Sequence, residues 1–209
     1  MASQEQLDIL DRQGRVIGQD TREQVHSLGL WHQTFHCWVL DPDMGAGGSL
    51  LFQLRHPSKD TFGGLLDISC AGHLLAGEEP KDGVRELREE LGLAVAFEDL
   101  LLCGTIAEES LPGPGLIDRE FSHVYLYVSD RAVESYDFQK EEISGLFFIG
   151  VEDITSLLRG ERESLDIRGV LADEASGVLR PERRVVRPEN FTPNSAEYYR
   201  LLFQGIGKL

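Results

Sequence analysis

Hydrophobic and polar positions alternate along much of this chain, and the alternation predicts strands joined by turns. Residues 7–18 alternate on both sides of Arg12-Gln13-Gly14, which is typical of a β-hairpin. Two apolar runs, at 34–40 and 49–55, flank a loop rich in proline and glycine and indicate two core strands. Apolar or β-branched content predicts four later strands, at 65–71, 94–107, 121–128 and 145–151.

A period near 3.6 residues indicates the clearest helix of the first half, at 82–91. Val84, Leu87 and Leu91 recur at i, i+3 and i+7, so they would share one face. Gly92 follows directly, where a glycine commonly ends a helix. Three further helices are predicted at 21–28, 152–158 and 195–203.

Strands and helices are mixed without strict alternation, and this order predicts an α/β (α+β) sandwich with a mixed sheet. The composition changes at residue 160, beyond which arginine, glutamate and proline become frequent. Within that part, 164–186 predicts a hairpin or an irregular arm. We therefore expect one domain over 1–159, including the N-terminal hairpin, and a C-terminal extension over 160–209 that packs on it.

The net charge of the chain limits which kinds of molecule it can bind. Asp and Glu number 36 against 20 Lys and Arg, for a net charge of -16. Nucleic acid or an anionic membrane would be repelled by this excess, so we expect neither as a partner. An apolar fraction of 41% fits a folded protein, and no apolar run approaches the roughly 20 residues of a membrane span. The first residues lack the pattern of a secretory signal, so we expect a cytoplasmic location.

The candidate chemistry is concentrated in the predicted helix 82–91. Glu86, Glu89 and Glu90 lie at i, i+3 and i+4, which places three carboxylates on one side of the helix. Clustered carboxylates are the ligands that Mg²⁺ or Mn²⁺ uses together with substrate phosphates. The spacing alone also fits a solvated face on which Arg85 pairs with Glu89. The glycine-rich segment that leads into the helix favours the metal-binding interpretation.

With their neighbours, these residues resemble the signature of the Nudix hydrolase family, Gly-x5-Glu-x7-Arg-Glu-U-x-Glu-Glu-x-Gly-U, where U is a bulky aliphatic residue. The matching positions here are Gly72, Glu78, Arg85, Glu86, Leu87, Glu89, Glu90, Gly92 and Leu93. Only six residues separate Glu78 from Arg85, so the position of Glu78 stays open. The resemblance implies a Nudix-like α/β/α sandwich and a hydrolase that cleaves a diphosphate linkage in a small molecule with Mg²⁺ or Mn²⁺.

A second set of residues is similar to the Nudix branch that contains type 1 isopentenyl-diphosphate isomerase and its hydrolase-like relatives. In the isomerase, histidines before the core strands, a histidine after the signature glycine and two acidic residues on a later strand form a metal site. By matching position, the resemblance implies these ligands here: His26, His32, His73, Asp118 and Glu120.

Isomerisation also needs a cysteine directly before the signature glycine, and this chain has Ala71 there. Cys70 lies one residue earlier, and an offset of one residue on a strand points a side chain to the opposite face. We therefore expect hydrolysis, which needs bound metal, a water and a base but no thiol. A catalytically inactive binding module is a further alternative, which the intact Arg-Glu-Leu-x-Glu-Glu sequence disfavours.

Individual roles follow in part from the resemblance. Arg85 is expected to orient a helix carboxylate through a bidentate bridge. The general base is left open between a helix glutamate, Glu120 and Glu142. Arg55 and Lys59 either contact the substrate phosphates or are solvated charges at a strand end.

The remaining histidines and the C-terminal extension have no assigned role in the chemistry. His36 and His123 lie within predicted strands and are interpreted as packing residues. The extension from residue 160 would either close the pocket or form a contact in a homodimer. The identity of the diphosphate substrate is not readable from the sequence.

Overall fold

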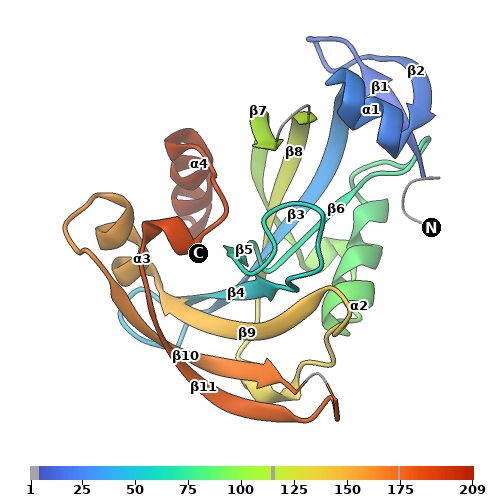
Figure 1. Ribbon diagram of the computed structural model, residues 1–209. Coiled ribbons are helices and arrows are strands. Elements are labelled where there is room, and N and C mark those ends of the chain that lie inside the picture. Colours follow the sequence, from blue (N-terminus) through green and yellow to red (C-terminus); the bar gives the residue numbers. More distant parts are fainter. Residues whose placement is uncertain (1–4, 114–115, 174) are drawn as a thin grey trace.

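The computed structural model describes residues 5–113, 116–173 and 175–209 (Figure 1). Its strands are β1 (Gln6–Leu10), β2 (Val16–Thr21), β3 (Trp31–Asp41), β4 (Ser49–Arg55), β5 (Leu66–Asp67), β6 (Cys70–His73), β7 (Leu101–Gly113), β8 (Leu116–Val128), β9 (Ile143–Gly150), β10 (Leu165–Ala172) and β11 (Leu179–Val186). Its α-helices are α1 (Arg22–Leu28), α2 (Arg85–Leu91), α3 (Val151–Leu158) and α4 (Ala196–Ile206).

Strand β3 connects the two halves of the mixed sheet. It pairs in parallel with β8 and antiparallel with β6, while its last two residues, Leu40 and Asp41, pair with β4. From β4 the sheet continues through β9 and β10 to β11. Because residues two apart on a strand share a face, His32, Thr34 and His36 project to one side of β3.

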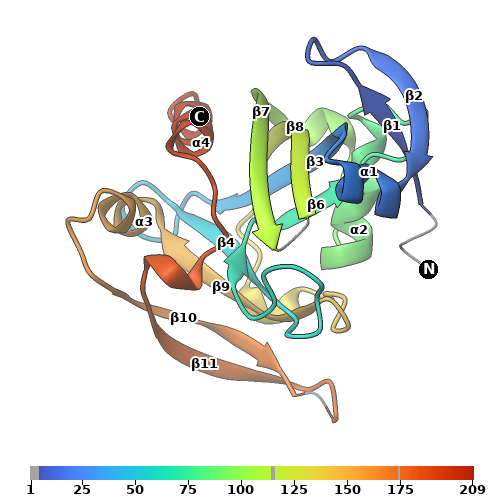
Figure 2. The same ribbon diagram turned by 45° about the horizontal axis from the view of Figure 1, so that its top comes forward.

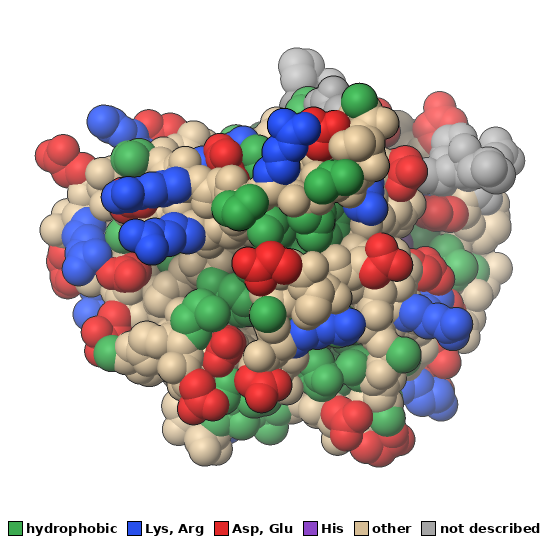
Figure 3. Space-filling model, turned by 90° about the horizontal axis from the view of Figure 1, so that it is seen from below, with side chains coloured by type: hydrophobic (Ala, Val, Ile, Leu, Met, Phe, Trp, Pro, Cys, Tyr) green, Lys and Arg blue, Asp and Glu red, His purple; other side chains and the backbone are tan. Residues whose placement is uncertain are grey.

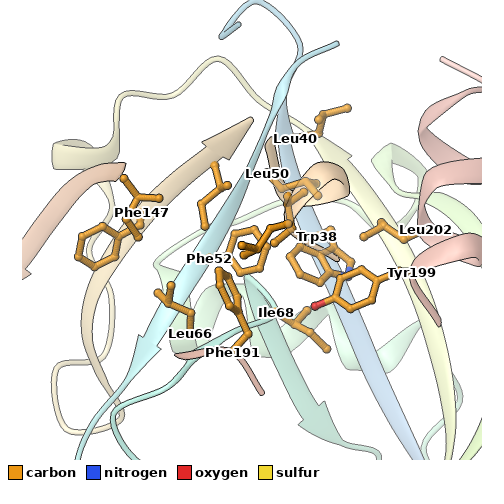
Figure 4. Close-up of a cluster of buried hydrophobic side chains, with 14 of the residues drawn as sticks. Trp38, Leu40, Leu50, Phe52, Leu66, Ile68, Phe147, Phe191, Tyr199 and Leu202 are labelled. Carbon is orange, nitrogen blue, oxygen red and sulfur yellow. The ribbon is translucent and has the colours of Figure 1, made fainter. Parts of the chain in front are cut away.

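Helices cover both faces of the sheet, as Figures 1 and 2 show, so the predicted fold class is confirmed. Leu87 and Leu91 of α2 share a buried cluster with Phe35 on one face of β3. On the other face, Leu202 of α4 shares a cluster with Trp38. Figure 4 shows that second cluster, which gathers aromatic rings from β3, β4, β9, α4 and the segment at Phe191.

The predicted strand 65–71 is divided into β5 and β6 by the side chain of Ser69. Its hydroxyl accepts a hydrogen bond from the Val39 amide at 2.8 Å and donates one to the Leu51 carbonyl at 2.5 Å. This hydroxyl therefore bridges β3 and β4 where the two strands do not pair directly. The division ends β5 at Asp67 and lets β6 continue to His73.

Among the other boundaries that differ from the predictions, two are explained by 3₁₀ turns. The predicted helix 82–91 begins as a 3₁₀ turn over Asp82–Val84 and becomes α-helical only at α2. The predicted strand 94–107 begins at β7, because Phe97–Asp99 form a 3₁₀ turn in which the Asp99 carboxylate accepts from the Ala96 amide. The glycine after α2 has the left-handed φ of 66° expected of a C-cap.

The C-terminal segment continues the sheet. Strands β10 and β11 pair in regular antiparallel register within the predicted segment 164–186, and β10 also pairs with β9. Ser195 caps α4 by accepting from the Tyr198 amide at 3.0 Å. The division of the chain at residue 160 stays a prediction.

Surface charge is mixed on the face shown in Figure 3, where acidic and basic side chains alternate with hydrophobic ones. None of the helices in the described part of the chain is long and apolar enough to cross a membrane.

Candidate active site and metal centre

The carboxylates of α2 lie along the free edge of β6. Among the described strands β6 pairs with β3 alone, so Ala71 and His73 direct their backbone groups away from β3. The Ala71 amide donates to Oε2 of Glu90 at 3.2 Å, and the His73 carbonyl accepts from Nη2 of Arg85 at 3.0 Å. Gln53 Nε2 lies 3.5 Å from the same oxygen of Glu90. Backbone groups of β6 thus hold the helix in place.

Gly72 is required by the close approach of Glu86. A Cβ atom on Gly72 would lie 2.2 Å from Cδ of Glu86, so any side chain there would displace the carboxylate. Glu90 is buried and Glu86 is largely shielded, whereas Glu89 is exposed at the rim. The helix therefore presents two carboxylates inward and one to solvent.

Arg85 makes its bidentate bridge to Glu78, which corrects the expectation that it would bridge a helix carboxylate. Nε and Nη2 of Arg85 each lie 2.9 Å from an oxygen of Glu78. Adjacent residues on a helix do not face each other, so Glu86 receives only a single bond, at 2.5 Å from Nη1. Glu78 also accepts from the Leu75 amide at 2.8 Å. The missing residue of the signature therefore leaves Glu78 paired with Arg85.

Burial raises the pKa values of the two inward carboxylates, Glu86 and Glu90. It raises the pKa of Glu90 to about 8, and the negative charge of Glu86 adds to the effect. Burial also raises the pKa of Glu86, although Arg85 opposes the shift. The hydrogen bonds from Arg85 instead lower the pKa of Glu78. A bound cation would favour the charged forms of both inward carboxylates.

Above the face of β3 that carries His32, five side chains converge; this group is called the histidine centre. Its members are His26 of α1, His32 of β3, His73 of β6, and Asp118 and Glu120 of β8. Nε2 of His26 lies 3.2 Å from Nε2 of His73 and 3.6 Å from Oδ1 of Asp118. Nε2 of His32 lies 3.6 Å from Oδ1 of Asp118 and 3.8 Å from Oε1 of Glu120.

Two buried atoms of the histidine centre have no hydrogen-bond partner among the described residues: Nε2 of His32 and Oδ1 of Asp118. The other ring nitrogens of the first two histidines are satisfied, because Nδ1 of His26 lies 2.9 Å from the Arg22 carbonyl and Nδ1 of His32 lies 3.1 Å from the Leu30 carbonyl. A carbonyl can only accept, so both Nε2 atoms carry a lone pair that faces the centre.

The donor set fits a divalent cation. Burial lowers the pKa of His32 to about 4 and that of His73 well below its usual range, so both imidazoles are neutral, the form in which histidine can bind a metal. A buried polar atom without a partner costs about 1–3 kcal/mol, and a cation at this point would satisfy both unpaired atoms. In metal-binding histidines, the ring nitrogen that does not bind the metal usually donates to a carboxylate, a backbone carbonyl or a water, and His26 and His32 have a carbonyl at this position.

Comparisons with known proteins decide the family. A family model described as the NUDIX domain matches residues 30–167, which is more than half of the chain. The chain belongs to the Nudix family. An uncharacterised Nudix hydrolase of Clostridium acetobutylicum is 37% identical over 203 residues, and the match covers 97% of each chain. The family and this relative support a hydrolase.

This Nudix protein is also similar to a relative from the isomerase branch and to a solved structure. An isopentenyl-diphosphate Delta-isomerase of Mycolicibacterium vanbaalenii is 37% identical over 138 residues, covering 65% of this chain and 72% of that protein. The crystal structure of DR0079 from Deinococcus radiodurans matches with a TM-score of 0.53 and 25% identity, covering 75% of this chain and 89% of that one. The predicted relationship to the isomerase branch is confirmed.

The basic residues before the site of this Nudix protein are engaged in internal ion pairs. Nη1 of Arg55 lies 2.7 Å from Asp67, and Nε donates to the Thr61 carbonyl at 3.1 Å. Lys59 Nζ lies 2.6 Å from Oε2 of Glu142. Arg55 is therefore held in an internal ion pair, and Lys59 is paired with one of the candidate bases. Contact of either residue with substrate phosphates stays a prediction.

His36 belongs to the surroundings of the histidine centre, which corrects its interpretation as a simple packing residue. Its Nε2 lies 3.7 Å from Oε2 of Glu120, and its Nδ1 lies 3.0 Å from the hydroxyl of Tyr198. The spacing of His32, Thr34 and His36 at every second position could have placed them on one face of β3.

Two other expectations about side-chain direction agree with the structure. His123 contacts Gln33 at 2.8 Å and Thr105 at 3.0 Å, away from the histidine centre. Cys70 is buried in the cluster that includes α2, whereas Ala71 packs against the cluster on the opposite face. No thiol therefore takes the place of the isomerase cysteine.

Proposed function

We propose that this Nudix hydrolase cleaves a diphosphate linkage in a small molecule, such as a nucleoside diphosphate derivative, by attack of water at phosphorus with Mg²⁺ or Mn²⁺ bound. The observation that carries the proposal is the position of β6 between two sets of ligand atoms. Ala71 holds Glu90 through its amide, and His73, two residues further on, enters the histidine centre.

The chain would hold metal at two groups of residues. Glu86 and Glu90 from inside and Glu89 from the rim form the first group, and the histidine centre forms the second. Divalent ions bound there would neutralise phosphate charge and lower the pKa of an attacking water. Arg85 bonds to Glu86 of the first group and to the His73 carbonyl, so it serves to position the helix against β6.

Glu142 is the candidate base that lies outside both ligand groups. Its segment lies beside the end of α2, because the Gln139 amide donates to the Glu90 carbonyl at 2.9 Å and the Glu142 amide donates to the Gln139 carbonyl at 3.1 Å. Lys59 neutralises Glu142 at 2.6 Å. A substrate phosphate that attracts Lys59 would release the Glu142 carboxylate to accept a proton from water.

Isopentenyl-diphosphate isomerisation is the second candidate, because the histidine centre and the Mycolicibacterium relative both favour that branch. Ala71 speaks against it, since an alanine side chain cannot donate or accept a proton. Cys70 cannot replace the missing thiol because it is buried on the opposite face of β6.

One assay tests both candidates. The protein is incubated with Mg²⁺ or Mn²⁺ and a panel of nucleoside diphosphate compounds plus isopentenyl diphosphate, and phosphorus and proton NMR follow hydrolysis and the allylic isomer together. We expect hydrolysis without isomer, reduced about 100-fold or more in Glu89→Gln and Glu90→Gln. Glu98→Gln, an exposed acidic residue outside the site, is the matched control. Hydrolysis that survives both substitutions would exclude the helix site, and isomer formation would favour the second candidate.

A further inference from the structure

Tyr198 of the C-terminal helix reaches into the surroundings of the histidine centre. Its side chain is fully buried, and its hydroxyl oxygen lies 3.0 Å from Nδ1 of His36 and 3.1 Å from Nε1 of Trp38. Both partners belong to β3, on the face that carries His32. Helix α4 lies beyond the residues matched by the Nudix family model, which end at 167.

The direction of these hydrogen bonds is fixed by chemistry. The indole nitrogen of Trp38 can only donate, so the Tyr198 oxygen accepts from it. The single hydroxyl proton of Tyr198 is then free to be donated to Nδ1 of His36. A histidine ring carries at least one ring proton, and Nδ1 of His36 accepts the hydroxyl proton of Tyr198 and so holds none of its own. The ring proton of His36 is therefore on Nε2.

The protonated nitrogen of His36 faces a carboxylate of the histidine centre. Nε2 lies 3.7 Å from Oε2 of Glu120, an oxygen that also lies 3.3 Å from the Thr34 hydroxyl and 3.4 Å from the Ser122 hydroxyl. The other oxygen, Oε1, lies nearer to Nε2 of His32, at 3.8 Å. A proton on His36 Nε2 attracts Oε2, whereas a lone pair there would repel it.

We propose that Tyr198 is a positioning residue for the histidine centre: it fixes the tautomer of His36 and so holds Glu120 with Oε1 turned toward the metal ligands. The inference rests on the proposed role of Glu120 as a ligand. It gives the C-terminal segment a function in the site, because the chain of hydrogen bonds from Trp38 to His36 is incomplete without α4.

Nitrogen NMR of the metal-free protein tests the tautomer directly, without substrate. Long-range proton–nitrogen spectra distinguish a ring protonated at Nε2 from one protonated at Nδ1. We expect His36 of the unmodified protein to be protonated at Nε2, and Tyr198→Phe to give a mixture of tautomers. A wild-type His36 protonated at Nδ1 would overturn the proposal even if the variant failed to fold.

The effect on the centre is measured by titration with Co²⁺, whose visible absorption reports histidine ligation. We expect Tyr198→Phe to weaken Co²⁺ binding about tenfold, as is usual when the partner of a metal ligand is lost. Tyr199→Phe is the matched control, since in the described part of the chain the hydrogen bond to Nδ1 of His36 comes from Tyr198 and not from this neighbouring buried tyrosine. Unchanged Co²⁺ affinity in Tyr198→Phe, or equal weakening in Tyr199→Phe, would contradict the proposal. Both readouts are independent of diphosphate hydrolysis, so an inactive wild-type protein would count against the proposed function alone.

Discussion

Three successive residues of β6 separate the functions of the site at the residue scale. Ala71 and His73 turn their side chains toward the histidine face, while their backbone groups bind Glu90 and Arg85. Gly72 between them leaves the space that Glu86 occupies. Alternation along a strand is therefore what brings the helix carboxylates and the histidine centre to one place.

The raised pKa of Glu90 predicts an unusual dependence of stability on pH. In the metal-free folded protein this carboxyl keeps its proton up to a pH of about 8, whereas in the unfolded chain it ionises near its ordinary value of 4.5. The folded state thus binds more protons than the unfolded state across this window. We expect the free energy of unfolding to fall by about 1–2 kcal/mol between roughly pH 6.5 and pH 8.

Urea unfolding with a metal chelator measures this slope. The window starts near pH 6.5 because buried histidines with lowered pKa values, such as His32 and His36, have the opposite effect below it. Glu90→Gln should reduce the slope, the remainder belonging to Glu86 and Glu120, whose pKa values burial also raises, and the exposed Glu98→Gln should leave it intact. An identical slope in wild type and Glu90→Gln would contradict the assignment of the raised pKa to Glu90.

Spacing in the sequence predicted which residues belong to the site, but it did not predict which side chains these residues contact. The carboxylates of Glu86, Glu89 and Glu90 share one side of α2 because helical periodicity alone fixes this. The bridge from Arg85 to Glu78 was missed, since it depends on how the preceding loop folds back. His36 was missed because its role depends on a tyrosine 162 positions later in the chain.

At the scale of elements, Arg85 ties α2 to the segment that precedes it. It bridges Glu78 in the loop and the His73 carbonyl at the end of β6. The apolar periodicity of 82–91 predicted the helix but not this anchor. In the same way, apolar content predicted one strand over 65–71, because nothing in the pattern reveals that the Ser69 hydroxyl replaces backbone pairing.

Arg85→Lys is expected to weaken this anchor. A lysine offers one charged group in place of the planar fork, so it cannot satisfy both oxygens of Glu78 and the His73 carbonyl together. We expect the free energy of unfolding to fall by about 1–2 kcal/mol. Urea unfolding with a metal chelator measures the change, with Arg88→Lys on the exposed side of the same helix as control.

A double-mutant cycle with Glu78→Gln isolates the bridge. The two substitutions should be less costly together than the sum of their separate effects, because each removes the same interaction. Additive losses would show that Arg85 stabilises the protein through its other contacts, to Glu86 and the His73 carbonyl.

At the scale of the whole molecule, the C-terminal segment and the Nudix core share one interior. Leu202 of α4 is fully buried in the same cluster as Trp38 of β3. A Cβ atom on Gly205 would lie 2.3 Å from Sγ of Cys103, so the helix is closely packed on β7. The change in composition at residue 160 predicted an extension, but composition cannot show whether such a segment shares the core or packs outside it.

This packing predicts that α4 unfolds together with the central sheet. The helix could open alone only by exposing Trp38 and the hydroxyl contacts of Tyr198, which costs both apolar burial and hydrogen bonds. Hydrogen exchange followed by mass spectrometry should therefore show amides of α4 exchanging on the same timescale as those of β3. Rapid exchange in α4 with β3 still protected would instead identify residues 160–209 as a separate unit. The tautomer of His36 would then be expected to vary with each opening of the helix.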